Sequence, residues 1–265
     1  MTDKGREAAV FLDRDGTINI DVGYLSDPDE LRLIGGAARA IKRLNGHGIK
    51  AVVITNQSGV ARGLVTEEDL GRINSRLVEI LGSHGAVLDG IYFCPHHPDE
   101  GCRCRKPAAG LVERAVRELD IDPARSYVVG DKAADVGLAR GSGAKAVLVL
   151  TGEGAGELKK LADPPDYVAA GLEEAVDWIL DDMGASSGRE PSRPGRGGGG
   201  GGLGALAPPG GTLVLWMAPD ASPHNKTFLH RRRRPHAPGL EVPQEGFRGE
   251  RGARRDRLAR GGAGE

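Results

Sequence analysis

The sequence predicts an α/β fold, a three-layer sandwich with a mostly parallel central sheet. Short apolar runs rich in β-branched residues alternate with amphipathic stretches along roughly the first 180 residues. Consecutive positions within these runs are apolar, which is typical of strands buried on both faces of a parallel sheet. Polar residues follow several of the runs directly. The carboxyl ends of parallel strands form one edge of a sheet, where ligands bind in such folds.

Each element of this fold has its own signal. The expected strands are Ala8–Leu12, Ala51–Ile54, Ile91–Phe93, Tyr127–Val129 and Ala146–Leu150. The expected helices are Ala37–Asn45, Thr66–Leu81, Gly110–Leu119, Lys132–Arg140 and Leu172–Leu180. The first helix is followed by Gly46 and Gly48, and the second opens on a capping-box-like pair, Thr66 with Asp69. Strands and helices in this alternation favour right-handed crossovers and three layers.

The chain divides by composition into a domain, residues 1–183, and a Gly/Pro/Arg-rich tail, residues 184–265, expected to be disordered. Lys and Arg number 22 against 30 Asp and Glu in the first part, and 14 against 7 in the second. The acidic domain makes nucleic acid an unlikely partner. For the basic block Arg231–Arg234, three interpretations stay open: solvated coil, contact with RNA or acidic membrane, or GC-rich DNA translated out of frame.

Nothing at the amino terminus is typical of a signal peptide, and no apolar stretch is long enough to span a membrane. We therefore expect a cytoplasmic protein without membrane contact. We also expect a monomer. Three cysteines in a reducing compartment favour metal binding over disulfides.

Two carboxylates, Asp13 and Asp15, leave the first apolar run two residues apart, and Gly16 permits a tight turn after them. Asp13 can attack phosphorus as a nucleophile. Asp15 can protonate the leaving oxygen and later activate the water that hydrolyses the acyl-phosphate, which divides one hard step into two. A turn or a calcium loop is the alternative for such a pair taken alone.

The segment Phe11–Thr17 resembles the first motif of the haloacid dehalogenase superfamily of phosphohydrolases. The other three motifs have counterparts in the same order: Val52–Ser58, Arg105–Pro107 and Val129–Asp135. The resemblance implies that Thr55 hydrogen-bonds a phosphoryl oxygen and that Lys106 neutralises its charge. Aspartate at position 15 is typical of the phosphatases and phosphomutases of the superfamily, and it favours hydrolysis over the ion pumping that other members perform. The motif alone leaves hydrolase and mutase open, because the choice depends on access of water.

The resemblance also implies a catalytic magnesium site formed by Asp13, Asp131 and the backbone carbonyl of Asp15. A hard cation there would reduce the repulsion between an anionic nucleophile and a phosphate. Asp135 would orient Lys106 or the metal-bound waters, or be a surface helix residue. The intervals between the motifs are too short for a cap domain, so we expect an open cleft.

A cysteine-rich loop precedes Lys106, with Cys94, His96, Cys102 and Cys104 as candidate ligands of a structural, tetrahedral zinc ion. His97 is the rival to His96. Because four protein ligands leave no open position, the ion would be structural. It would restrain the loop that delivers Arg105 and Lys106 to the site.

With this loop, the sequence closely resembles the D-glycero-D-manno-heptose 1,7-bisphosphate 7-phosphatase family, in the histidinol-phosphatase-like branch. The resemblance implies hydrolysis of the 7-phosphate of that sugar through an aspartyl-phosphate. Hydrolysis of histidinol phosphate is the alternative, and a polynucleotide-end phosphatase or nucleic-acid-binding protein is less favoured. The residues implied to contact substrate are Asp21, Gly23, Tyr24, Asn56, Gln57, Ser58, Arg105 and Lys132.

Overall fold

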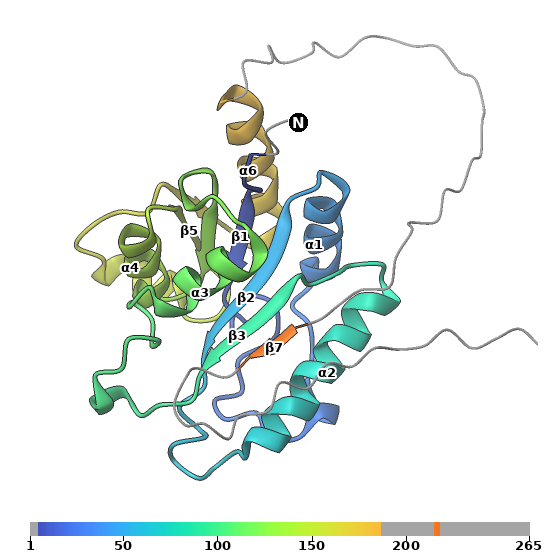
Figure 1. Cartoon of the computed structure of the whole chain (residues 1–265), viewed down its shortest axis with the longest axis vertical. Helices are drawn as coiled ribbons and strands as arrows, with labels where there is room; N and C mark the ends of the chain where they lie inside the picture. The colour runs from blue at the N-terminus through green and yellow to red at the C-terminus, as the bar shows by residue number, and fades with distance from the viewer. Residues whose placement is uncertain (1–4, 187–214, 218–265) are drawn as a thin grey trace, which may run out of the picture. The chain divides into compact units, whose positions relative to one another are not determined.

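The computed structural model describes residues 5–186 and 215–217 of the chain, and its centre is a parallel β-sheet (Figure 1). Neighbouring strands pair in the order β6-β5-β4-β1-β2-β3-β7, and every pair is parallel. The strands are β1 Ala9–Leu12, β2 Lys50–Asn56, β3 Gly90–Cys94, β4 Tyr127–Gly130, β5 Lys145–Val149, β6 Tyr167–Ala169 and β7 Leu215–Met217.

Helices cover both faces of the sheet, and the side chains of β1 alternate between two apolar cores. Val10 and Leu12 pack in the core formed with α1, α2 and α6. Ala9 and Phe11 pack in the core formed with α3 and α4. The helices are α1 Ala37–Gly46, α2 Glu67–Ser83, α3 Gly110–Leu119, α4 Ala133–Ser142, the short α5 Gly154–Glu157 and α6 Leu172–Ser186. The expected three-layer α/β architecture is therefore confirmed.

All five expected strands and all five expected helices are present, and their ends lie within two residues of the expected positions except in α6, which runs to Ser186 instead of Leu180. The capping box at the start of α2 is also confirmed, since Thr66 Oγ1 accepts a hydrogen bond from the Asp69 amide at 3.0 Å. The predictions omitted β6, α5 and β7. α6 continues three residues past the expected domain boundary at Met183. Of the expected tail, Leu215–Met217 forms β7, while residues 187–214 and 218–265, which include the basic block, lie outside the described residues.

The strand order places β1 at the centre of the sheet, with β2 on one side and β4 on the other. The chain therefore winds outward from β1 in both directions, which leaves a crevice at the carboxyl ends of the central strands. Within residues 5–186, loops and 3-10 turns connect these strands to the helices, with the longest connections over residues 13–36 and 95–109, and no cap domain interrupts them. Among the described residues, no separate domain therefore covers this crevice.

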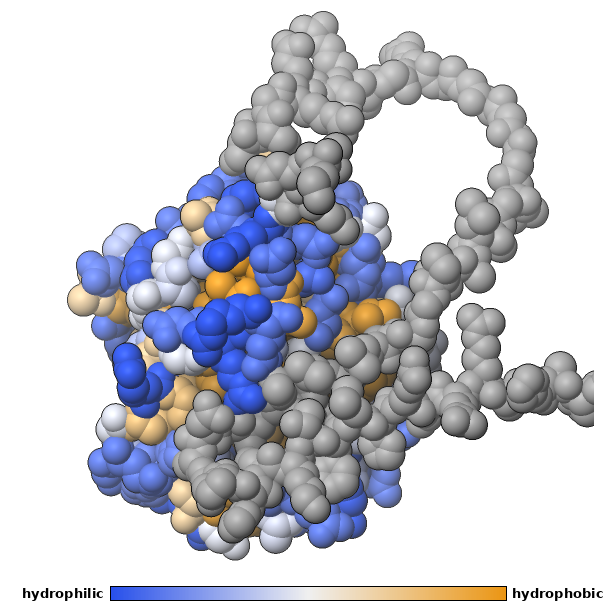
Figure 2. Space-filling view, viewed as in Figure 1, coloured by the Kyte–Doolittle hydropathy of each residue, from blue (hydrophilic) through white to orange (hydrophobic). Residues whose placement is uncertain are grey.

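On the face shown in Figure 2, hydrophilic side chains cover much of the described surface, and hydrophobic groups lie between them in patches. In the part of the chain that the structure describes, no helix combines the length and the apolar character needed to cross a membrane.

Candidate active site

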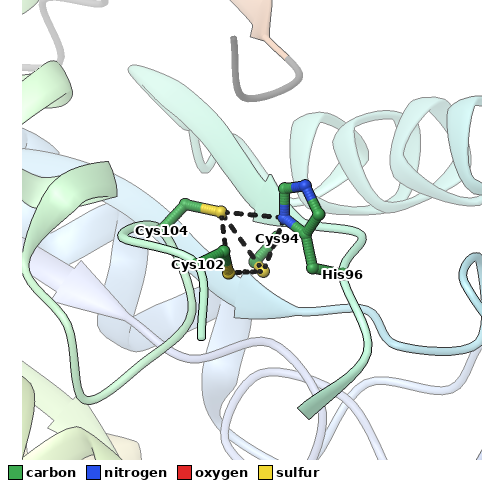
Figure 3. Close-up of side chains that lie close together, drawn as sticks. All are labelled: Cys94, His96, Cys102 and Cys104. Carbon is green, nitrogen blue, oxygen red and sulfur yellow. Dashed lines mark hydrogen bonds between the residues drawn. The ribbon is translucent and has the colours of Figure 1, made fainter. Parts of the chain in front are cut away.

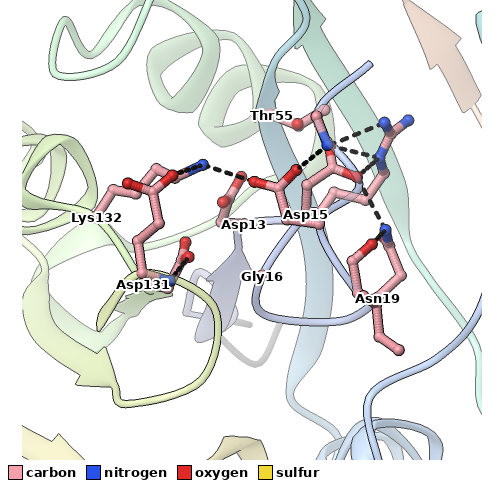
Figure 4. Close-up of polar contacts among 12 residues, drawn as sticks. Asp13, Asp15, Gly16, Asn19, Thr55, Asp131 and Lys132 are labelled. Atoms are coloured by element: carbon pink, nitrogen blue, oxygen red, sulfur yellow. Dashed lines mark hydrogen bonds and ion pairs between the residues drawn. The ribbon is translucent and has the colours of Figure 1, made fainter. Parts of the chain in front are cut away.

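The loop after β1 carries two carboxylates to the carboxyl edge of the sheet (Figure 4). The amide of Asp13 donates to the carbonyl of Val129 on β4 at 2.9 Å, which fixes the start of this loop between two strands. Gly16 turns the chain with φ +89°, and a Cβ there would lie 2.2 Å from Oδ2 of Asp131. Only glycine lets the loop approach Asp131 this closely.

Lys106 lies between two buried carboxylates. Its Nζ is 2.6 Å from Asp13 Oδ1 and 2.7 Å from Asp135 Oδ1. Burial alone would lower the pKa of Lys106, but the two carboxylates outweigh burial and raise it. Burial raises the pKa of Asp13 to about 7, although the charge of Lys106 opposes this shift. Asp135 thus orients Lys106, one of the two roles expected for it.

Asp15 accepts hydrogen bonds from three neighbouring side chains. Arg14 donates from Nε and Nη2, the latter at 2.9 Å. Asn19 Nδ2 and Gln57 Nε2 donate at 2.9 and 2.8 Å. Burial opposes ionisation of Asp15, but the Arg14 guanidinium and these hydrogen bonds lower its pKa. The carboxylate is therefore held in one orientation.

Thr55 lies within β2, not after it, and its buried hydroxyl accepts a hydrogen bond from Gln57 Nε2 at 2.8 Å. The neighbouring Asn56 makes a reciprocal pair with Lys106: its Oδ1 accepts from the Lys106 amide at 3.0 Å, and its Nδ2 donates to the Lys106 carbonyl at 3.3 Å. The end of β2 therefore fixes the backbone of the lysine loop.

Asp131 follows β4 and forms a cluster with Asp13 and Asp135, in which ligand oxygens of all three lie within 4.8 Å of one another. Its Oδ2 accepts from the amide of Glu153 at 2.9 Å, but its Oδ1 is buried without a hydrogen-bond partner. An unpaired buried carboxylate oxygen among other acids suits a hard divalent cation, because such ions take oxygen ligands. All three carboxylates are candidate ligands, and two of them, Asp13 and Asp135, also pair with Lys106.

A cleft of about 400 Å³ is lined by Asp13, Asp15, Thr55, Lys106 and Asp135. All eight residues expected to contact substrate also lie in its wall: Asp21, Gly23, Tyr24, Asn56, Gln57, Ser58, Arg105 and Lys132. Lys132 Nζ forms ion pairs with Asp21 at 3.0 Å and with Glu153 at 3.4 Å. Arg105 has a buried Nη1 without a hydrogen-bond partner. An unpaired cationic donor in the wall of a cleft can bind an anionic group.

Cys94, His96, Cys102 and Cys104 converge at the end of β3 (Figure 3). The sulfur atoms lie 3.4–3.5 Å from one another, and His96 Nδ1 is 3.1 Å from Cys104 Sγ. Three thiols and one imidazole in this arrangement can hold a tetrahedral metal ion. His97 instead caps a 3-10 turn, where its Nδ1 accepts from the Asp99 amide, so the structure selects His96.

Three buried residues of this region were not expected at the site: Arg14, Asn19 and Asn74. Asn74 had a signal in the sequence, since it lies one helical turn from Leu70 and therefore on the apolar face of α2. A polar side chain on a core-facing position needs a partner, and its Oδ1 accepts from Arg14 Nη1 at 3.0 Å.

The fold and these residues together define a phosphatase of the haloacid dehalogenase type: paired carboxylates after the central strand, a hydroxyl on the next strand, a buried lysine and an acidic cation site. The family model described as HAD-hydrolase-like matches residues 103–175.

The D-glycero-β-D-manno-heptose-1,7-bisphosphate 7-phosphatase of Haemophilus ducreyi is 46% identical, over 55% of this chain and 84% of that protein. The enzyme of the same name from Yersinia pestis is 44% identical, over 66% of this chain and 90% of that protein. The chain belongs to the D-glycero-D-manno-heptose-1,7-bisphosphate 7-phosphatase family.

A solved structure agrees with this assignment. The D,D-heptose 1,7-bisphosphate phosphatase of B. bronchiseptica, crystallised with magnesium and phosphate, superposes with a TM-score of 0.63 at 36% identity. The match covers 66% of this chain and 99% of that one.

Proposed function

We propose that this chain hydrolyses the 7-phosphate of D-glycero-D-manno-heptose 1,7-bisphosphate. The observation that carries the proposal is the pairing of Asp13 with Lys106 in an open cleft whose wall also holds Arg105 with an unpaired Nη1. Asp13 and Lys106 are placed to act on the phosphate that is cleaved, the first as nucleophile and the second as a positive charge. The guanidinium suits a second phosphate on the same small molecule, because its planar donors can bind two phosphate oxygens at once.

The reaction proceeds in two transfers. In the first, a carboxylate oxygen of Asp13 forms a bond to phosphorus, the bond from phosphorus to the sugar oxygen breaks, and Asp15 passes a proton to that oxygen. The surroundings of Asp15 lower its pKa in the substrate-free site, so it takes up this proton when the negative charge of the bound phosphate favours the protonated form. In the second, a water oxygen attacks phosphorus, the bond to Asp13 breaks and the water proton passes to Asp15. Lys106 and Thr55 steady the phosphoryl oxygens throughout.

Magnesium is the cation we propose for the acidic cluster, held by Asp13, Asp131 and the carbonyl of Asp15. When bound, it supplies positive charge between the nucleophile and the phosphate. The orphaned Oδ1 of Asp131 supports this assignment. Lys132, Asp21 and the neighbouring cleft residues would contact the sugar.

A panel of phosphorylated substrates tests the proposed activity. We expect kcat/KM for the heptose 1,7-bisphosphate to exceed kcat/KM for histidinol phosphate by at least about 100-fold, because histidinol phosphate has no second phosphate for Arg105. Both anomers of the heptose bisphosphate belong in the panel. The Arg105→Ala variant should lose most of this preference while retaining turnover of simple monophosphates. A higher kcat/KM for histidinol phosphate would overturn the proposed substrate.

Zinc is the metal we propose for the Cys94, His96, Cys102 and Cys104 cluster, in a structural role. Cys104 lies two residues before Lys106, so an ion at the cluster would restrain the lysine loop. Removal of zinc should therefore lower kcat about tenfold or more, because the support of an active-site group is lost. Metal content and kcat should be measured on the same sample after chelation and after return of Mg²⁺ alone. Activity that Mg²⁺ alone restores fully would show that the zinc is incidental.

A further inference from the structure

We infer that Arg14 and Asn74 are positioning residues that hold the Asp15 carboxylate in the orientation needed for proton transfer. Asn74 is on α2, sixty residues along the chain from the loop that it would support. The inference rests on the proposed role of Asp15 as the acid and base of the reaction. Asn74 does not line the cleft, so its effect on catalysis would be transmitted through Arg14.

Arg14 is the first link in this arrangement. Although it lies between the two carboxylates in sequence, its side chain is only 1% exposed, and it is the largest fully buried side chain of the described residues. The guanidinium directs Nε and Nη2 at Asp15. A planar fork that bonds to both carboxylate oxygens fixes the plane of the carboxylate as well as its position.

Asn74 is the second link. It is fully buried on the apolar face of α2, and its Oδ1 accepts from Nη1 of Arg14 at 3.0 Å. Its Nδ2 has no hydrogen-bond partner. The site therefore uses the Asn74 side chain only as an acceptor, and it leaves the amide donor unsatisfied, which is unfavourable for a buried polar group. Asn74 Oδ1 binds Nη1 of Arg14, while Nε and Nη2 bind Asp15, so Asn74 can hold the guanidinium in place from its other end.

The other donors to Asp15 complete a fixed geometry. Asn19 Nδ2 bonds to Oδ1, and Gln57 Nε2 bonds to Oδ2 while also donating to Thr55. Without Asn74, one end of the Arg14 guanidinium would be buried with no acceptor, and the guanidinium would shift to find one. Asp15 would move with it, away from the leaving oxygen.

The test compares two leaving groups in an Asn74→Leu variant, which removes the acceptor at similar volume. A sugar oxygen must be protonated as it leaves, whereas p-nitrophenolate is a stable anion that does not depend on an acid. kcat/KM reports events up to formation of the phosphoenzyme. We expect Asn74→Leu to lower kcat/KM for the best sugar phosphate of the panel at least about tenfold more than kcat/KM for p-nitrophenyl phosphate, since small misplacements of a reacting group are costly.

Two further variants control for effects on folding. Asn74→Asp keeps an acceptor oxygen for Arg14 and removes the orphaned donor, so it should restore most of the sugar-phosphate activity. Asn45→Leu makes the same change on α1, where Asn45 hydrogen-bonds both to the amide and to the carbonyl of Val87 away from the cleft. It should lower the activities on the two substrates equally, if at all.

A double variant distinguishes the positioning role of Asn74 from the proton-transfer role of Asp15. Asp15→Asn alone should show the same selective loss on the sugar phosphate, and adding Asn74→Leu to it should cause no further loss, because the two residues act through one group. An equal loss on both substrates in Asn74→Leu, with a selective loss in Asp15→Asn, would overturn the inference alone. Equal losses in Asp15→Asn would overturn the proposed role of Asp15.

Discussion

Asp13→Asn is expected to abolish turnover, with kcat falling by at least about 10⁴-fold, because an amide cannot form the acyl-phosphate that the reaction requires. The substitution changes no volume. Lys106 would keep its ion pair with Asp135 at 2.7 Å, so its buried charge would stay compensated and the fold should remain intact. Steady-state kinetics, acid trapping of the phosphoenzyme and thermal unfolding would measure these three effects.

The matched control is Asp29→Asn, the same chemical change at an exposed position in a 3-10 turn. It should leave kcat unchanged. Trapped phosphoenzyme in Asp13→Asn, or more than about 1% of the original kcat, would contradict the assignment of Asp13 as the nucleophile.

Much of the fold could be predicted from the sequence because the central strands carry an unambiguous local signal. β1, β2 and β4 are buried along almost their entire length, so their apolar runs are continuous. β6 lacks this signal. It has three residues, two of them only half buried, at a position that pairs with β5 alone. β7 was also omitted, and its pairing with β3 joins segments more than 120 residues apart.

The candidate site was predictable to the extent that its residues follow strands. Asp13, Asp131 and Lys106 could be placed together because the carboxyl ends of parallel strands share an edge. The burial of Arg14 could not be anticipated in the same way. Its partner Asn74 belongs to α2, sixty residues further along the chain, and only the packing of α2 against the loop after β1 brings the two together.

The cysteine-rich loop shows the same limit of prediction from sequence. Spacing alone left His96 and His97 as rivals, because adjacent residues in a loop can both reach a common point. In the structure His96 points to the three cysteines, while His97 satisfies the amide of Asp99. His97 therefore has a backbone partner of its own, and His96 is the histidine that lies among the cysteines.

Lys106→Met is expected to reduce both activity and stability, because it removes the cation between Asp13 and Asp135 while keeping a side chain of similar length. Two buried carboxylates would then face each other without compensation. In buffer without added Mg²⁺, the free energy of unfolding should fall by about 3–5 kcal/mol, the usual cost of breaking a buried ion pair from one side. Loss of the charge that steadies the phosphoryl group should lower kcat about 10³-fold. Urea denaturation and steady-state kinetics measure the two effects.

A second substitution separates these effects. Adding Asp135→Asn to Lys106→Met removes one of the two uncompensated charges, so part of the lost stability should return while kcat stays low. The exposed Lys159→Met serves as the matched control and should alter neither property. If Asp135→Asn restored kcat together with stability, Lys106 would act only by holding the fold. If Lys106→Met left stability unchanged, Asp13 and Asp135 would have to be neutralised by another group, and the charge balance assigned to this buried triad would be wrong.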